Sequence, residues 1–231
     1  MERVHVVEHP AVADRLTRLR DGVAPPALFR RLLEELGTFL AYEATRVLAT
    51  QPVEVRTPLG PAAGRRFAGR PVAAPILRAG LGLLPGFLTV IEEAVVAHLG
   101  FFRDPDTLAA IPYYANLPDD LSGRDVFVLD PMLATGHTAA AAIGFLAARG
   151  ARDPWLLCAI AAPEGLAHLL EAHPGAQIVT AAIDHGLNEH GYILPGLGDA
   201  GDRMFGSASS LPAGFRPGAA AQPGGAAQRG G

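Results

Sequence analysis

Apolar runs of strand length alternate with stretches of helical character along most of the chain. The apolar runs occupy residues 70–77, 94–102, 125–130, 154–163 and 176–184. The helical stretches between them are residues 82–93, 138–149 and 164–174. Continuous apolar strands that alternate with helices are typical of a parallel sheet covered on both faces. The pattern therefore predicts an α/β fold with a parallel sheet flanked by helices, plus a small hood or arm region.

The N-terminal part predicts further elements before this alternation begins. Residues 3–10 are read as a short strand, and residues 11–22 as a helix that stops at Gly22. Pro25 and Pro26 open the next helix, because proline is well tolerated in a first helical turn. Its apolar face is formed by Leu28, Leu32, Leu36 and Leu40. The segments 53–58 and 64–69 resemble two strands or arms around a Gly/Pro turn.

Two other segments suggest an interface and a tail. The stretch "IPYYANLP" is expected to form an arm at a subunit interface around residues 112–118, carrying Tyr113 and Tyr114. Residues 207–231 are rich in Gly, Ala and Pro and poor in bulky apolar side chains. Such composition favours disorder. We therefore expect one domain over residues 1–206 and a low-complexity, disordered tail over 207–231.

Composition excludes several classes of protein. The net charge is −4, which argues against a broad electrostatic surface for nucleic acid. All 19 basic residues are arginines, so neither a Schiff-base lysine nor a P-loop lysine is available. The single cysteine, Cys158, sits in an apolar run and is expected in the core. Neither a membrane-spanning run nor a signal pattern is seen, so we expect a cytoplasmic protein without membrane contact.

The segment that follows residues 127–129 carries the chemistry. Asp130 ends an apolar strand, and "PMLATGH" leads into an alanine-rich helix expected to begin at Thr138. Gly136 permits a tight turn, the hydroxyls of Thr135 and Thr138 are donors, and the helix N-terminus favours an anion. This pattern suggests a phosphate site, with Asp130 placed to accept hydrogen bonds from a sugar. An ordinary strand–helix turn with Thr as N-cap is the alternative.

Four segments in order resemble one enzyme family. "LATGHT" after an apolar strand and an acid resembles the phosphoribosyl-binding signature of type I phosphoribosyltransferases, and "DPMLATG" resembles their uracil phosphoribosyltransferase branch. "PILRAGLG" resembles that branch's diphosphate-side loop, "GFFRDPDTL" its arginine segment, and "DHGLNEHGYILPGLGDAGDRMFG" its base-binding region. "YEAT" and "AAPEG" also fit, so the resemblance covers roughly the first 206 residues.

The resemblance implies transfer of a phosphoribosyl group from 5-phosphoribosyl 1-diphosphate (PRPP) to uracil, yielding UMP and diphosphate. It implies catalytic roles for Arg78, Arg103, Asp130 and Asp199. The implied PRPP-binding residues are Arg78, Arg103, Asp130, Pro131, Met132, Leu133, Ala134, Thr135, Gly136, His137, Thr138 and Asp199. The implied uracil-binding residues are Ile193, Gly198, Asp199 and Ala200. It further implies Mg²⁺ that arrives with PRPP rather than on a protein metal site, a GTP effector as in some members, and a homodimer or higher homo-oligomer.

Three positions depart from the family pattern. His137 replaces a common glycine, which would be strained if the position needs a positive φ angle. Pro131 stands where relatives often carry a second acid. Pro105 replaces a residue that is usually not proline and would stiffen the arginine segment.

Other interpretations stay open. The chain could use another base such as hypoxanthine or orotate, or it could be a regulatory protein that senses nucleotides and binds RNA. Arg78 and Arg103 could be surface arginines, and Asp199 and Asp202 could merely cap turns. A metal cluster is a weak alternative, because its spacing is poor; its members would be Asp184, His185, Asn188 and Glu189.

Overall fold

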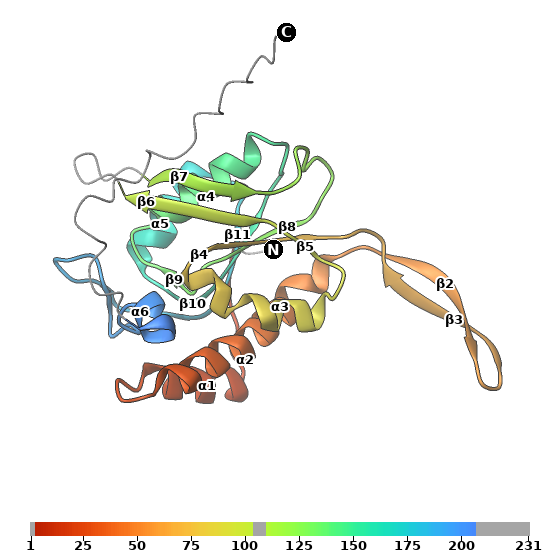
Figure 1. Cartoon of the computed structure of the whole chain (residues 1–231), viewed down its shortest axis with the longest axis horizontal. Coiled ribbons are helices and arrows are strands. Elements are labelled where there is room, and N and C mark those ends of the chain that lie inside the picture. Colours follow the sequence, from red (N-terminus) through yellow and green to blue (C-terminus); the bar gives the residue numbers. More distant parts are fainter. Residues whose placement is uncertain (1–2, 104–109, 207–231) are drawn as a thin grey trace, which may run out of the picture.

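The computed structural model describes residues 3–103 and 110–206, and its centre is a mostly parallel sheet (Figure 1). In spatial order the strands are β1 (Val4–Val6), β11 (Gln177–Ile183), β10 (Trp155–Ala161), β8 (Val126–Leu129), β4 (Val72–Leu77), β6 (His98–Arg103) and β7 (Ala110–Asn116). The short strand β5 (Val95–Val96) pairs with β4, and β9 (Met132–Leu133) pairs with β10. All these pairs are parallel except β6–β7.

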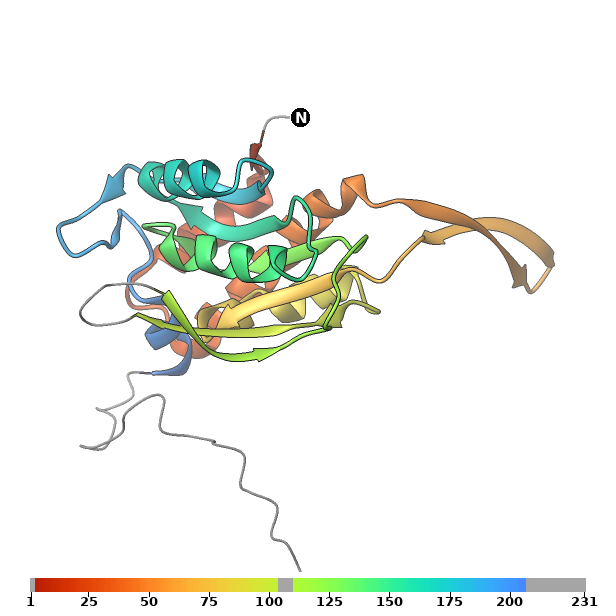
Figure 2. The same cartoon turned by 90° about the horizontal axis from the view of Figure 1, so that it is seen from above.

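Helices cover both faces of this sheet, as the two perpendicular views show (Figures 1 and 2). One face carries α1 (Pro10–Arg20), α2 (Pro26–Ala44) and α3 (Leu84–Val90). The other carries α4 (His137–Ala147) and α5 (Pro163–Ala172). Alternate strand residues point to the two layers, because side chains of a strand alternate in direction. Phe127 and Leu157 join the first core, whereas Val128, Leu156 and Cys158 join the second. The predicted fold class is therefore confirmed.

Cys158 is a core residue, as expected from its sequence context. It is fully buried, and this burial raises the pKa of its thiol to about 12. Such a thiol stays protonated at neutral pH and is a poor nucleophile.

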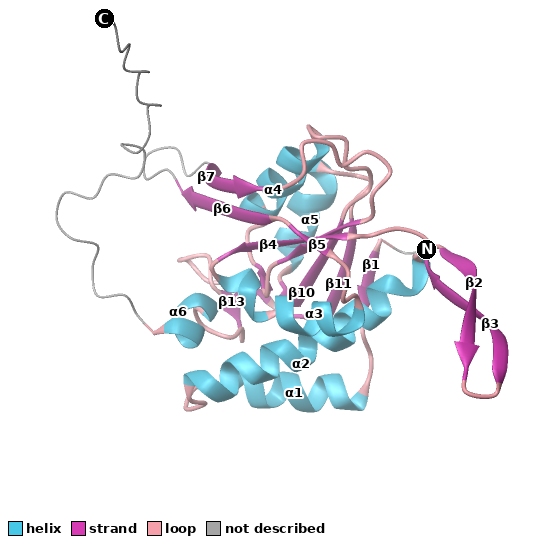
Figure 3. Ribbon diagram, turned by 45° about the vertical axis from the view of Figure 1, so that its right-hand side comes forward, coloured by secondary structure: helices cyan, strands magenta, loops and turns pink. Residues whose placement is uncertain are grey.

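A long hairpin leaves the body of the molecule (Figures 1 and 3). It follows the short 3₁₀ helix Thr45–Val47 and consists of β2 (Thr50–Thr57) and β3 (Gly60–Phe67), paired antiparallel. Val55, Leu59 and Phe67 are exposed on it. The expected pair of arms around a Gly/Pro turn is thus confirmed as one β-hairpin.

The segment expected as an arm around residues 112–118 proved to be the edge strand β7. The sequence pattern hid it, because Pro112 and two adjacent tyrosines break the alternation, and proline is tolerated only at a sheet edge. The β6–β7 register shifts between Gly100 and Phe101. A β-carbon at Gly100 would lie 2.6 Å from Cζ of Tyr113, so the tyrosine ring covers the glycine. The single strand expected over residues 94–102 is likewise divided into β5 and β6 at Ala97.

The C-terminal part forms a small hood beside the sheet, at the opposite end of the molecule from the hairpin (Figures 1 and 2). It contains the two-residue strands β12 (Gly186–Leu187) and β13 (Ile193–Leu194) and the short helix α6 (Ala200–Phe205). The helix was not predicted, because six residues with a glycine carry no clear apolar period. The proposed tail over residues 207–231 and Pro105 lie outside the described residues. Within those residues, no helix combines the length and apolar character needed to cross a membrane.

Candidate active site

The loop after β8 and β9 forms a small cavity at the carboxyl end of the sheet. Gly136 has a φ of +83° and is the N-cap of α4, which has no side-chain cap. The helix begins at His137, so the alternative of a threonine N-cap is wrong. The cavity measures about 50 Å³. Its lining residues are Asp130, Met132, Leu133, Ala134, Thr135, Gly136, Thr138 and Ala139.

Close contacts at two glycines pack the start of α5 against this loop. A β-carbon at Gly165, in the first turn of α5, would lie 2.3 Å from the carbonyl oxygen of Ala134. A β-carbon at Gly136 would lie 2.8 Å from the carbonyl oxygen of Gly165. The start of α5 therefore packs directly on the loop, and the N-terminal end of α4 faces the cavity. A cavity of this size beside a helix N-terminus suits a phosphate group.

Asp130 is a carboxyl group in a poorly solvated position. It lies between β8 and β9, and burial raises its pKa to about 7. The only partner found for it in the described part of the chain is the N–H of Met132, which donates to Oδ1 at 3.5 Å and slightly opposes this rise. A carboxylate short of donors in such a site is suited to accept hydrogen bonds from hydroxyl groups of a ligand.

His137 does not carry the strain that a positive φ would impose. Among the described residues, Asp153 is the non-glycine residue with a positive φ, so His137 is not in that conformation. Gly136 takes the left-handed conformation, and His137 is the first residue of the helix. The His137 ring lies against the ring of His168 of α5, with centroids 4.3 Å apart and planes tilted by 30°. It is not part of the cavity lining. The substitution of the family's glycine is thus accommodated outside the cavity.

Arg78 reaches the site from the neighbouring strand β4. It follows the cis peptide bond Leu77–Arg78 and precedes a 3₁₀ turn, Ala79–Gly82. Its Nη2 lies 3.5 Å from Oδ1 of Asp202, and its guanidinium carbon lies 5.9 Å from the ring centre of Phe205. The side chain is half exposed, and its contact with Asp202 is long for a hydrogen bond.

The hood supplies the remaining predicted residues. Ile193 is buried in β13, and Gly198 has a φ of +69°. Asp199 is the N-cap of α6 and accepts a hydrogen bond from the N–H of Asp202 at 2.8 Å. The capping interpretation of Asp199 is therefore correct, while Asp202 pairs with Arg78. Ala200 is buried directly behind this cap.

Two contacts bring the loops together. A β-carbon at Gly191 would lie 3.7 Å from Cγ2 of Thr135, so Gly191 of the hood lies beside the cavity loop. A β-carbon at Gly201 would lie 3.2 Å from Oδ1 of Asp199 and 3.7 Å from Nη2 of Arg78. The hood thus lies near both the cavity loop and Arg78. Arg103 ends β6, and its side chain lies outside what the structure describes.

Sequence reasoning missed the role of α6 in this site. Asp202 and Phe205 lie beside Arg78, although Asp202 was interpreted only as a turn cap and Phe205 was given no role of its own. The only available signal was the acid in the first turn after an Asp N-cap, which is too common to single out.

The same segments match known proteins. The family model described as uracil phosphoribosyltransferase matches residues 6–207, which include the cavity loop, Arg78 and the hood. The chain belongs to the uracil phosphoribosyltransferase family. A protein of this name from Kineococcus radiotolerans is 54% identical over 208 residues, with 88% of this chain and 99% of the relative covered. A second protein of this name, from Caulobacter sp. strain K31, is 51% identical over 208 residues, with 90% of this chain and 100% of the relative covered.

A solved structure is similar to this chain over almost its whole described length. The AQ2163 protein from Aquifex aeolicus has a TM-score of 0.84 and 37% identity, covering 90% of this chain and 100% of that one. The resemblance inferred from the motifs is confirmed by the family model and the named relatives.

Proposed function

We propose that the protein transfers the phosphoribosyl group of PRPP to N1 of uracil, producing UMP and diphosphate. The bond between C1 of the ribose and the diphosphate oxygen breaks, the C1–N1 bond forms, and the N1 proton is released. The observation that carries this proposal is the meeting of the phosphate-sized cavity with the hood at Thr135 and Gly191. A sugar phosphate and a base held on either side of that contact would be aligned for transfer.

The cavity loop would hold the ribose 5-phosphate. We assign its binding to backbone N–H groups of residues 134–138 and to the hydroxyls of Thr135 and Thr138, at the N-terminal end of α4. Asp130 would accept hydrogen bonds from the ribose 2- and 3-hydroxyls. Its raised pKa reflects the free site, because donors from a sugar would favour the ionised carboxylate.

Arginines and Mg²⁺ would neutralise the leaving diphosphate. Arg78 and Arg103 are suited to this, since guanidinium groups bind phosphate oxygens through two N–H donors. Mg²⁺ would arrive with PRPP, because hard cations prefer phosphate and water oxygens. Within the described residues, no three His, Cys, Asp or Glu side chains are grouped to hold a metal ion. Asp199, which lies beside Gly201 as Arg78 does, would contact PRPP directly or through Mg²⁺.

The hood would recognise the base. Uracil presents alternating carbonyl and N–H groups along one edge, and exposed backbone can match them. We assign these contacts to Ile193, Gly198, Asp199 and Ala200. A base such as cytosine, with an amino group in place of a carbonyl, would leave backbone groups unpaired and be rejected.

Association and regulation are part of the proposal. The protruding β2–β3 hairpin with exposed Val55, Leu59 and Phe67 supports a homodimer or larger homo-oligomer. Sedimentation would test this, and an apparent monomer at working concentration would count against it. GTP is proposed as an effector on the resemblance alone, so activity should be compared with and without it.

The first experiment is a product assay. The full chain is incubated with labelled uracil, PRPP and Mg²⁺, and parallel reactions contain cytosine, orotate or hypoxanthine. UMP from uracil alone is expected, with strong loss in Asp130→Asn and none in Asp125→Asn, an exposed carboxyl before β8 at the far end of the strand. Product from another base would support the alternative acceptor.

If no base is turned over and the protein shows salt-sensitive RNA binding, the regulatory alternative would be supported. The absence of lysine and the net charge of −4 argue against it.

A further inference from the structure

We propose that the C-terminal end of α1 positions the base-recognition segment, with Arg20 and Asp184 as positioning residues for uracil. This inference rests on the proposed function, because it assigns a role to residues that hold the hood and do not themselves contact substrate. The hood lies more than 160 residues from α1 in sequence. Two arginines, Arg20 and Arg203, join the hood to α1 and together form what we call the clamp.

The first arginine runs from α1 to the hood. Arg20 Nη1 donates to Oδ2 of Asp184 at 2.9 Å, and Nη2 donates to Oδ1 at 2.5 Å. Nη1 also donates to the carbonyl oxygen of Gly196 at 2.9 Å, and the N–H of Gly196 donates to Oδ2 of Asp184 at 3.0 Å. The Asp184 side chain is only 4% exposed. A buried carboxylate with this many donors holds its neighbours in one geometry.

The second arginine extends from the hood back to α1. Arg203 of α6 donates from Nη1 to the carbonyl oxygens of Leu19 at 2.8 Å and Leu197 at 2.9 Å. Its Nη2 donates to the carbonyl oxygen of Asp21. The guanidinium also stacks on Phe29 of α2, 4.2 Å from the ring centre. Both ends of the segment 184–203 are therefore tied to the last turn of α1.

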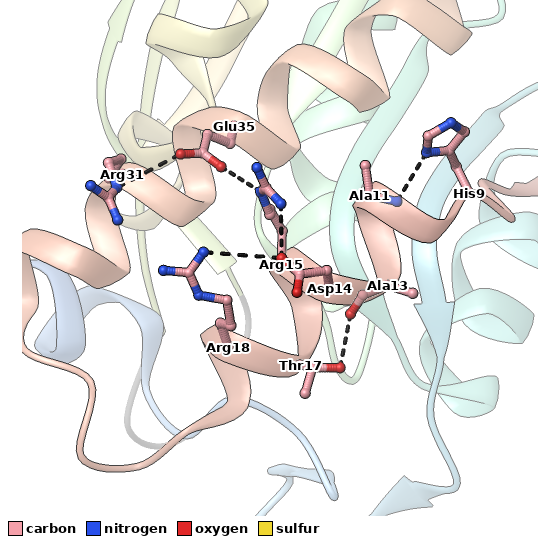
Figure 4. A network of polar contacts seen from close by, with 9 residues as sticks. All are labelled: His9, Ala11, Ala13, Asp14, Arg15, Thr17, Arg18, Arg31 and Glu35. Atoms are coloured by element: carbon pink, nitrogen blue, oxygen red, sulfur yellow. Dashed lines mark hydrogen bonds and ion pairs between the residues drawn. The ribbon is translucent and has the colours of Figure 1, made fainter.

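The helix that receives these ties is itself fixed (Figure 4). Arg15 donates from Nε to Oε2 of Glu35 on α2 at 2.6 Å, and the N-terminus of α1 is capped by His9, which accepts from the N–H of Ala11 at 3.1 Å. Arg18 lies on the same helix but makes only a 4.0 Å ion pair with Asp14. The α1 helix can thus serve as a rigid support for the hood.

The clamp acts on the residues assigned to uracil. Gly196 lies between Ile193 and Gly198 and has a φ of +67°. A β-carbon there would lie 2.0 Å from the carbonyl oxygen of Ile193, so the turn is tight and a shift of Gly196 would move both neighbours. The phosphate cavity is supported separately, by the contact of Gly165 with Ala134. Loss of the clamp should therefore weaken uracil binding and spare PRPP binding.

The test measures KM for uracil and for PRPP in the full chain. The variants are Arg20→Lys, which keeps the charge but loses the bidentate fork, and Asp184→Asn, which keeps the side-chain shape. The control is Arg18→Ala on the same helix. We expect KM for uracil to rise about 10-fold or more in the first two variants, with KM for PRPP within about twofold of the parent. UMP binding by calorimetry should weaken in parallel.

Three results would overturn the inference: an unchanged KM for uracil in folded variants, equal rises for both substrates, or failure of both variants to fold. The last would show that the pair holds the fold rather than the base site. If the parent chain and Arg18→Ala make no UMP, the proposed function fails. If the parent is active and KM for uracil is unchanged in Arg20→Lys and Asp184→Asn, only the positioning role is contradicted.

Discussion

Gly80 lies against the carbonyl oxygen of Leu129, so closely that a β-carbon at position 80 would be 2.2 Å from that oxygen. This contact joins the turn after β4 to the end of β8. Arg78 lies two residues before this glycine, and Asp130 lies one residue after this leucine. The packing of the two strand ends that carry Arg78 and Asp130 thus depends on the absence of a side chain at position 80.

We therefore predict that Gly80→Ala pushes this turn away from β8. The free energy of unfolding should fall by about 1–3 kcal/mol, as for other overpacked sites, and KM for PRPP should rise. Denaturant unfolding and steady-state kinetics would measure both effects. Gly69→Ala is the matched control, because nothing lies within 4 Å of a β-carbon there. Equal behaviour of the two variants would contradict the prediction.

The raised pKa of Asp130 predicts a pH-dependent stability. In the unfolded chain this carboxyl ionises near 3.8, but in the free folded protein near 7. Folding is thus opposed as the pH rises from about 4 to 7, because the folded state must keep the proton or bury the charge. Asp130→Asn should be more stable than the parent above pH 7, by up to about 4 kcal/mol, and no more stable near pH 3.

Urea unfolding across this pH range would measure the difference between the two proteins. Asp125→Asn serves as the control, since its carboxyl is exposed. A difference that did not grow between pH 4 and 7 would show that Asp130 is ionised normally in the free protein.

Replacing His137 with the family's glycine tests whether its imidazole contacts the phosphate. Because the ring lies against His168 outside the cavity lining, His137→Gly should leave KM for PRPP within about twofold. Stability should fall by about 0.5–1 kcal/mol, because the ring contact with His168 is lost. A tenfold rise in KM for PRPP would instead place the imidazole on the substrate.

The residues after the hood are predicted to be dispensable for turnover. Truncation after Gly206 removes the low-complexity segment beyond α6 and should leave kcat and both KM values unchanged. Truncation after Asp199 is the contrasting variant, because it removes the buried Met204 and the Arg203 clamp. That variant should lose activity and stability. A large loss in the first truncation would show that the tail contributes to the site.

Periodicity predicted most of the core correctly, because burial on both faces leaves a local trace in residues such as those of β8 and β10. It failed where that trace is weak. In β7, Pro112 and exposed tyrosines obscure an edge strand, and in α6 six residues are too few for a helical period. The site residues were predicted from ordered motifs, and the structure places those it describes after the carboxyl ends of β4, β8 and β11.

The sequence by itself determined the alternating strands and helices, the glycine-bearing turn after Asp130 and the family to which the motifs belong. These depend on neighbours along the chain, so they can be read locally. Only the tertiary structure decided the raised pKa of Asp130, the packing of Gly80 on Leu129 and the pairing of Arg20 with Asp184. Desolvation, close packing and ion pairing depend on which remote segments the fold places side by side, and local pattern carries no record of that choice.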